Sequence, residues 1–233
     1  INSLLDEWQN RQILKELQQQ YATLRIEPNH KKVTPVAFNL GIKASQGDYV
    51  LIVGARQVLD KNYLQSCVNA MEEDPNVGCV GGMVNNVYLN KEGEYIARAM
   101  ASPFGVGGGN FRTIQTKSFV DTVGTPFYRR AIFDEIGFFD EALKRNQDDD
   151  FNYRVLQSGK KILLEPKAKL SYYVRGNYSN LSRQYKQYGY WKVYVNRKHK
   201  TVTTIRQVFP ALWLLFLLVG WLPVFIHPML ILP

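Results

Sequence analysis

Apolar residues along this chain recur in two rhythms, one typical of helices and one typical of buried strands. Residues 4–21 are mainly polar, with apolar residues near helical spacing, which predicts a surface helix. Residues 36–45 show a second helical pattern. Residues 49–53 form a continuous apolar run between turn residues, which predicts a strand buried on both faces.

The same alternation continues along the chain. We expect strands at residues 24–26, 77–80 and 161–164, and helices at residues 59–74, 127–136 and 151–158. Periodicity is poor over residues 85–119. Helices that alternate with buried strands predict an α/β fold with a mostly parallel sheet flanked by helices. Ligands of such sheets bind at the carboxyl ends of strands, which points to Gly54, Ala55 and Arg56, just after the strand at 49–53.

The C-terminal part has a different pattern. Residues 179–197 are amphipathic and rich in tyrosine and cations, which predicts a helix lying at a membrane interface. Residues 208–226 carry no charge, and the apolar sequence continues to Pro233. A bilayer span needs about 20 such residues, so this run predicts a transmembrane segment. A buried core helix is the alternative.

Charge is divided unevenly between these parts. The net charge is +9, yet residues 1–165 carry 19 Lys or Arg against 20 Asp or Glu. Residues 166–233 carry 10 Lys or Arg and no acid. A basic segment of this kind suits anionic lipid or nucleic acid. The adjoining apolar run favours membrane over nucleic acid as the partner.

Composition excludes other classes. A hydrophobic content of 45% argues against disorder. Cys67 and Cys79 lie in apolar surroundings, so we expect buried free thiols in a reducing compartment. The three histidines, His30, His199 and His227, have no Cys or His at zinc-ligand spacing.

Three consecutive carboxylates are the strongest chemical signal. Asp148, Asp149 and Asp150 precede an apolar helical run that contains Arg154. Like charges raise one another's pKa, and a carboxylate held in this way is a suitable general base. Alternatively the cluster begins a helix, where carboxylates are favoured electrostatically. For Asp150 both interpretations stay open. The glycine-rich residues 104–112 could hold phosphate by their backbone amides or form a plain loop.

Taken in order, these motifs resemble family 2 glycosyltransferases of the GT-A fold. The resemblance is strongest to the membrane-bound enzymes that assemble bacterial exopolysaccharides such as succinoglycan. It covers roughly residues 11–210 and rests on the segments at residues 34–42, 47–50, 128–130, 137–141, 146–154 and 183–192.

The resemblance implies an inverting transfer from a nucleotide-sugar donor to a lipid-linked or polysaccharide acceptor at the cytoplasmic face of the inner membrane. It assigns the catalytic base to Asp148, with Asp149 adjacent. The donor diphosphate would contact Gly54, Arg56 and Asn39. The acceptor or the interface would involve the α-helical residues Gln187, Trp191 and Arg183.

The chain also departs from the family pattern. Such enzymes usually hold Mn²⁺ or Mg²⁺ with an Asp-x-Asp motif, and here Gly54-Ala55-Arg56 stands in its place. The metal site is therefore unknown, and Arg56 could pair directly with the diphosphate. Tyr190 replaces the arginine of processive synthases, which favours addition of a single sugar. A catalytically degenerate relative that binds a glycan or a partner is the alternative.

The expected organisation has three parts. Residues 1–178 would form the GT-A-like domain, with the family's first strand lying upstream of Ile1. Residues 179–207 would form the basic interfacial helix, and residues 208–233 the transmembrane segment.

Overall fold

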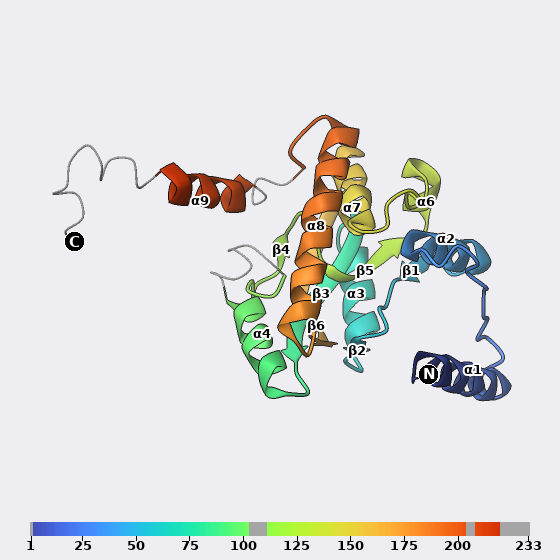
Figure 1. Cartoon of the computed structure of the whole chain (residues 1–233). Coiled ribbons are helices and arrows are strands. Elements are labelled where there is room, and N and C mark those ends of the chain that lie inside the picture. The colour runs from blue at the N-terminus through green and yellow to red at the C-terminus, as the bar shows by residue number, and fades with distance from the viewer. Residues whose placement is uncertain (1, 103–110, 204–207, 220–233) are drawn as a thin grey trace, which may run out of the picture.

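A computed structural model describes residues 2–102, 111–203 and 208–219 (Figure 1). Side chains are described from Asn10 onward, except that of Pro210. The glycine-rich stretch for which a phosphate-binding role was considered lies largely outside these residues.

One sheet forms the centre of the molecule. In the described residues it has six strands, with the order β1-β5-β3-β6-β2 and with β4 paired to β6. The strands are β1 (Tyr49–Leu51), β2 (Gln57–Leu59), β3 (Val77–Val87), β4 (Ser118–Phe119), β5 (Gly124–Arg129) and β6 (Lys161–Tyr173).

The sheet is mixed, so the prediction of a mostly parallel sheet is wrong. Only β3 and β6 pair in parallel among the described strands, and the other pairings are antiparallel. An apolar run indicates that a strand is covered on both faces. It does not indicate whether the strand runs parallel or antiparallel to its neighbours. Helices cover both faces of this sheet, so antiparallel strands are as apolar here as parallel ones.

Alternate residues of each central strand enter two different cores. Cys79 of β3 and Tyr128 of β5 pack on one face, with residues of α2 (Thr34–Ala44), α6 (Ala131–Ile136) and α7 (Gln147–Gln157). Their neighbours in the strands, Val80 after Cys79 and Phe127 before Tyr128, pack on the other face with α3 (Tyr63–Glu72). The strand at 49–53 follows this rule as far as Leu51, which confirms burial on both faces there.

Other helices lie around this body. The helix α4 (Lys91–Ala101) forms a smaller core with Val174 and Leu181. The long helix α8 (Tyr178–His199) runs beside α7 and is tied to it by ion pairs (Figure 1). The helices α1 (Asn2–Gln20) and α9 (Val208–Val219) lie apart from the sheet on opposite sides.

Several local predictions need correction. No strand forms at residues 24–26, because the segment finds no pairing partner. The helix expected at 59–74 begins only at Tyr63, since residues 57–59 pair with β6 as a strand. The helix expected at 127–136 is split between β5 and α6. The stretch without clear periodicity contains α4, and α7 begins at Gln147 rather than at residue 151.

The predicted transmembrane segment is not borne out within the described chain. The helix α9 covers 12 of its residues, and the part after Val219 lies outside the described residues. No helix over residues 2–102, 111–203 and 208–219 combines the length and apolarity of a membrane span.

Candidate active site

The three adjacent carboxylates lie in the first turn of α7. The helix begins after Asn146, whose backbone is left-handed (φ 58°). Carboxylates here are stabilised by the positive end of the helix dipole. Successive residues on a helix point about 100° apart, so the three side chains reach three different surroundings.

Asp148 keeps an exposed side chain, and no ion pair joins it to any described residue. Protein atoms crowd it nevertheless, and their restriction of its hydration is the main cause that raises its pKa. The Asp149 charge also raises the pKa, backbone N–H groups and Lys192 lower it, and the net result is a pKa of about 6. Asp148 is therefore a carboxylate that is accessible, charged at neutral pH and more basic than usual.

Asp149 is held in place by two groups. Its Oδ2 lies 2.8 Å from Nζ of Lys192 on α8 and accepts a hydrogen bond of 2.8 Å from the Asn146 side chain. Asp149 thus joins the loop before α7 and the helix α8, and its role beside Asp148 at the site stays a prediction.

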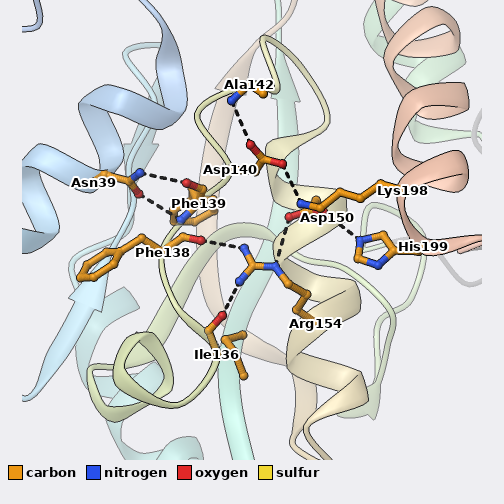
Figure 2. A network of polar contacts seen from close by, with 10 residues as sticks. All are labelled: Asn39, Ile136, Phe138, Phe139, Asp140, Ala142, Asp150, Arg154, Lys198 and His199. Atoms are coloured by element: carbon orange, nitrogen blue, oxygen red, sulfur yellow. Dashed lines mark hydrogen bonds and ion pairs between the residues drawn. The ribbon is translucent and has the colours of Figure 1, made fainter.

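Asp150 is completely buried and is contacted by Arg154, Lys198 and His199 (Figure 2). Nε of Arg154 lies 3.1 Å from its Oδ2, while Nζ of Lys198 and Nε2 of His199 lie 2.7 and 2.8 Å from its Oδ1. Arg154 also donates to the carbonyls of Ile136 and Phe138. The two interpretations of Asp150 are thus resolved in favour of a structural role, because its oxygens are occupied inside the protein.

The helix α8 brings further polar groups toward α7. Oε1 of Gln187 accepts a hydrogen bond of 3.0 Å from Nε of Arg145. Burial raises the pKa of Tyr188, and the nearby Asp148 charge raises it further. Trp191 packs edge-on between Tyr190 and Tyr194, and Arg183 is exposed. Sequence reasoning missed Arg145, because it stands outside the motifs, and it assigned no site role to Tyr188, although Tyr188 lies within the segment 183–192.

The residues expected on the donor side are scattered. The buried amide of Asn39 donates to the carbonyl of Phe139 (2.9 Å) and accepts from its N–H (3.0 Å). Figure 2 shows this pairing, which joins Asn39 of α2 to the turn before α7, and a contact of Asn39 with the donor stays a prediction. Gly54 is exposed after β1, and its N–H donates to Gln57.

Arg56 is partly buried at the ends of two strands. Its Nη2 donates to the carbonyl of Val174 at 2.5 Å, and its guanidinium carbon lies 5.6 Å from the ring centroid of Tyr172. Arg112 approaches the same ring, at 5.7 Å. Sequence reasoning missed Arg112 and Tyr172, since chain distance hid their proximity to Arg56.

The residues after β1 do not fit the divalent metal that is usual in GT-A enzymes. Mn²⁺ and Mg²⁺ need oxygen ligands, and this position offers Gly54, Ala55 and a guanidinium. The next carboxylate, Asp60, accepts a hydrogen bond from the N–H of Asn62. Over the described ranges, no three His, Cys, Asp or Glu side chains gather closely enough to hold a metal ion.

The two cysteines are confirmed as buried free thiols. Burial raises the pKa of Cys67 to about 12, so this thiol stays protonated and unreactive at neutral pH. Both belong to the cores rather than to the candidate site.

Two curated proteins are similar to the chain over most of its length. A dolichyl N-acetyl-α-D-glucosaminyl phosphate 3-β-D-2,3-diacetamido-2,3-dideoxy-β-D-glucuronosyltransferase of Methanococcus voltae is 30% identical over 94% of this chain and 71% of its own. The succinoglycan biosynthesis protein ExoA of Rhizobium meliloti is 24% identical over 92% of this chain and 67% of its own.

Among solved structures, GalNAc-T7, crystallised with UDP, GalNAc and Mn²⁺, has a similar fold. Its TM-score is 0.56 at 13% identity, over 73% of this chain, which spans 36% of the GalNAc-T7 chain. The sequence profile of Glycosyl transferase family 2 matches residues 9–137, more than half of the chain. The resemblance in the motifs is thereby confirmed, and the chain belongs to glycosyl transferase family 2, a family of nucleotide-sugar-dependent glycosyltransferases.

Proposed function

We propose that this protein transfers a sugar from a nucleotide-sugar donor to a lipid-linked or polysaccharide acceptor, with Asp148 as the general base. The observation that carries the proposal is the state of Asp148, which is exposed and has a pKa of about 6. A base works best when its pKa lies near the operating pH, because it is then both deprotonated and able to take a proton. The names of the two curated relatives support the class of acceptor.

The transfer would be inverting and take place in one displacement. The acceptor hydroxyl oxygen bonds to the anomeric carbon as the bond from that carbon to the diphosphate oxygen breaks. Asp148 takes the hydroxyl proton, and the nucleoside diphosphate leaves on the opposite face of the sugar. Arg56, with the exposed backbone at Gly54, would contact the diphosphate, since a guanidinium matches phosphate oxygens.

The acceptor would approach past α8. Gln187 contacts Arg145, which shortly precedes α7 in the chain, and Trp191 and Arg183 lie on the same helix as Gln187. The exposed aromatic side chains of α8 and the apolar surface of α9 suit a membrane interface on the cytoplasmic side. A lipid-linked acceptor would then place its sugar beside Asp148 on α7.

The test is transfer by membranes that contain the full-length protein. UDP-, GDP- and dTDP-linked hexoses carrying a radiolabelled sugar would be supplied, and label would be followed into the lipid fraction. Membranes lacking the protein serve as the control. Label above this control from at least one donor is expected, and its absence with every donor would contradict the proposal.

A second function is favoured by one observation, the replacement of the metal-binding motif by Gly54-Ala55-Arg56. A degenerate relative would bind a glycan or a partner subunit without turnover. Nucleotide hydrolysis or transfer in the assay above would exclude this alternative.

A further inference from the structure

Two arginines from distant parts of the chain lie against one tyrosine ring. The guanidinium carbons of Arg56 and Arg112 lie 5.6 and 5.7 Å from the ring centroid of Tyr172. Arg56 follows β1, Arg112 lies before β4, and Tyr172 is near the end of β6. Ligands in open α/β sheets bind at such strand ends.

The geometry of Arg56 leaves one of its donors without a partner. Its Nη2 is fixed on the carbonyl of Val174, whereas its buried Nη1 has no hydrogen-bond partner among the described residues. A buried charged donor without a partner costs free energy, so its presence points to a bound anion.

Arg112 adds a second positive charge, and its buried surroundings disfavour the charged form. Burial lowers its pKa, and the phenol groups of Tyr172, Tyr185 and Tyr188 act in the opposite direction. Its Nε lies 3.4 Å from the Oδ1 of Asn86. An anion placed between the two guanidiniums would stabilise both charges.

Tyr188 links this pair of arginines to the proposed base. The charge of Asp148 and the hydroxyl of Tyr172 both act on Tyr188, which in turn acts on Arg112. Tyr188 of α8 is therefore within electrostatic reach of both Asp148 and Arg112. These effects favour a single site that contains the arginines and Asp148.

We propose that Arg56 and Arg112 together hold the diphosphate of the nucleotide-sugar donor, and that donor binding consequently needs no divalent metal. The inference rests on the proposed transferase function. Two planar guanidiniums supply several N–H donors and two positive charges, which match the charge of a sugar nucleotide's diphosphate. They would also stabilise the negative charge that grows on the leaving diphosphate.

The test is equilibrium binding of UDP and GDP to the full chain in detergent, measured by calorimetry with EDTA and again with Mn²⁺. Arg56→Gln and Arg112→Gln are compared with Arg98→Gln, a matched control whose side chain is exposed and pairs with Glu94 on α4. Uridine and guanosine, which lack phosphates, are the control ligands. Thermal unfolding checks that each variant is folded, and a glutamine variant that is not folded is replaced by the lysine variant of the same residue, Arg56→Lys or Arg112→Lys.

With EDTA, we expect the wild type to bind one of the diphosphates with the dissociation constant found in Mn²⁺. Each of the two glutamine variants should weaken that binding roughly 10-fold or more, since a charge-assisted hydrogen bond is lost. Arg98→Gln should bind as the wild type does, and nucleoside binding should be the same in every variant.

Two results would overturn the inference and leave the transferase function standing. One is nucleotide binding that disappears with EDTA, and the other is EDTA-resistant binding that neither arginine variant weakens. Binding of neither nucleotide under any condition would overturn the inference and count against the proposed transferase as well.

Discussion

At the scale of single residues, three neighbouring aspartates of the same charge do three different things. Asp148 faces solvent, Asp149 pairs with Lys192, and Asp150 is buried against Arg154, Lys198 and His199. The rotation of the helix decides this separation, because each residue turns about 100° from the last. Only Asp148 combines access with a raised pKa, so catalytic effects should concentrate on it.

Replacement of Asp148 by Asn should lower kcat roughly 10²–10⁴-fold, the usual contribution of a general base. Donor binding should change little, because Asp148 is not placed on the diphosphate. In the wild type, kcat/KM should fall as the pH drops below about 6, where Asp148 takes up a proton. Initial rates of Asp148→Asn and Asp149→Asn over pH 5–8 check this. An equal loss in both variants would count against Asp148 as the sole base.

The same residue should influence stability in a defined direction. The pKa of Asp148 is about 6 in the folded chain and 3.8 ordinarily, so the unfolded chain releases this proton first as the pH rises. Its contribution to stability therefore decreases between about pH 4 and pH 6 and stays low above that. At pH 7 the melting temperature of Asp148→Asn should be equal to or higher than that of the wild type. Below about pH 4 the two melting temperatures should be the same. A lower melting temperature at pH 7 would mean that Asp148 makes a stabilising contact.

Replacement of Asp150 by Asn, in contrast, should lower the stability of the fold. Asn in its place leaves Arg154, Lys198 and His199 without the buried negative charge they share. Loss of one partner from a buried ion pair costs about 3–5 kcal/mol. The free energy of unfolding from urea denaturation of Asp150→Asn should fall by about that amount, against little change for Asp148→Asn. Similar values for both would show that burial of Asp150 does not matter.

At the scale of elements, α8 completes the site from a separate part of the chain. It is tied along its length, by Arg145 to Gln187, by Asp149 to Lys192 and by Asp150 to Lys198. The amphipathic pattern predicted this helix well, and its observed range is Tyr178–His199. Its position over α7 could not be predicted, because the pattern identifies an apolar face and not the surface that covers it.

Lys192 of α8 influences the pKa of the proposed base, Asp148. Its positive charge lowers the pKa of Asp148. Lys192→Gln should therefore raise that pKa further and move the acid limb of the pH–rate profile to higher pH. Rates of the detergent-solubilised protein across pH 5–8 measure the shift. Lys186→Gln, which removes an exposed lysine from the same helix, should leave the profile unchanged. A shift of equal size in both variants would indicate a general charge effect rather than a local one.

The strands show where sequence patterns stop being informative. Val77–Val87 and Lys161–Tyr173 were predicted only in their apolar first residues, although they form the long parallel pair at the centre. Their later residues include Asn85, Lys167 and Lys169, which break the apolar pattern at a sheet end that is partly exposed. That end carries Tyr172, so the strand residues at the proposed donor site were the ones least visible in the sequence.

At the scale of the whole molecule, the sequence separates into a nearly neutral body and a basic C-terminal part that ends in apolar residues. The net charge of residues 1–165 is close to zero, whereas residues 166–233 carry 10 cations and no acid. The structure places exposed aromatic residues of α8 and the apolar α9 in this basic region. Such a surface would bind anionic lipid through both electrostatic and apolar contacts.

Vesicle binding should therefore depend on lipid charge, on salt and on exposed cations of α8. The full chain should bind vesicles containing phosphatidylglycerol more tightly than neutral ones, and 0.5 M salt should reduce the difference by screening. Arg183→Gln should weaken partitioning about 5-fold, since one basic residue near an anionic surface contributes about 1 kcal/mol. Arg98→Gln on α4 removes an equal charge from the body and should have no such effect. Sedimentation with vesicles measures all of these, and equal binding to neutral and anionic vesicles would show that the basic surface faces something other than lipid.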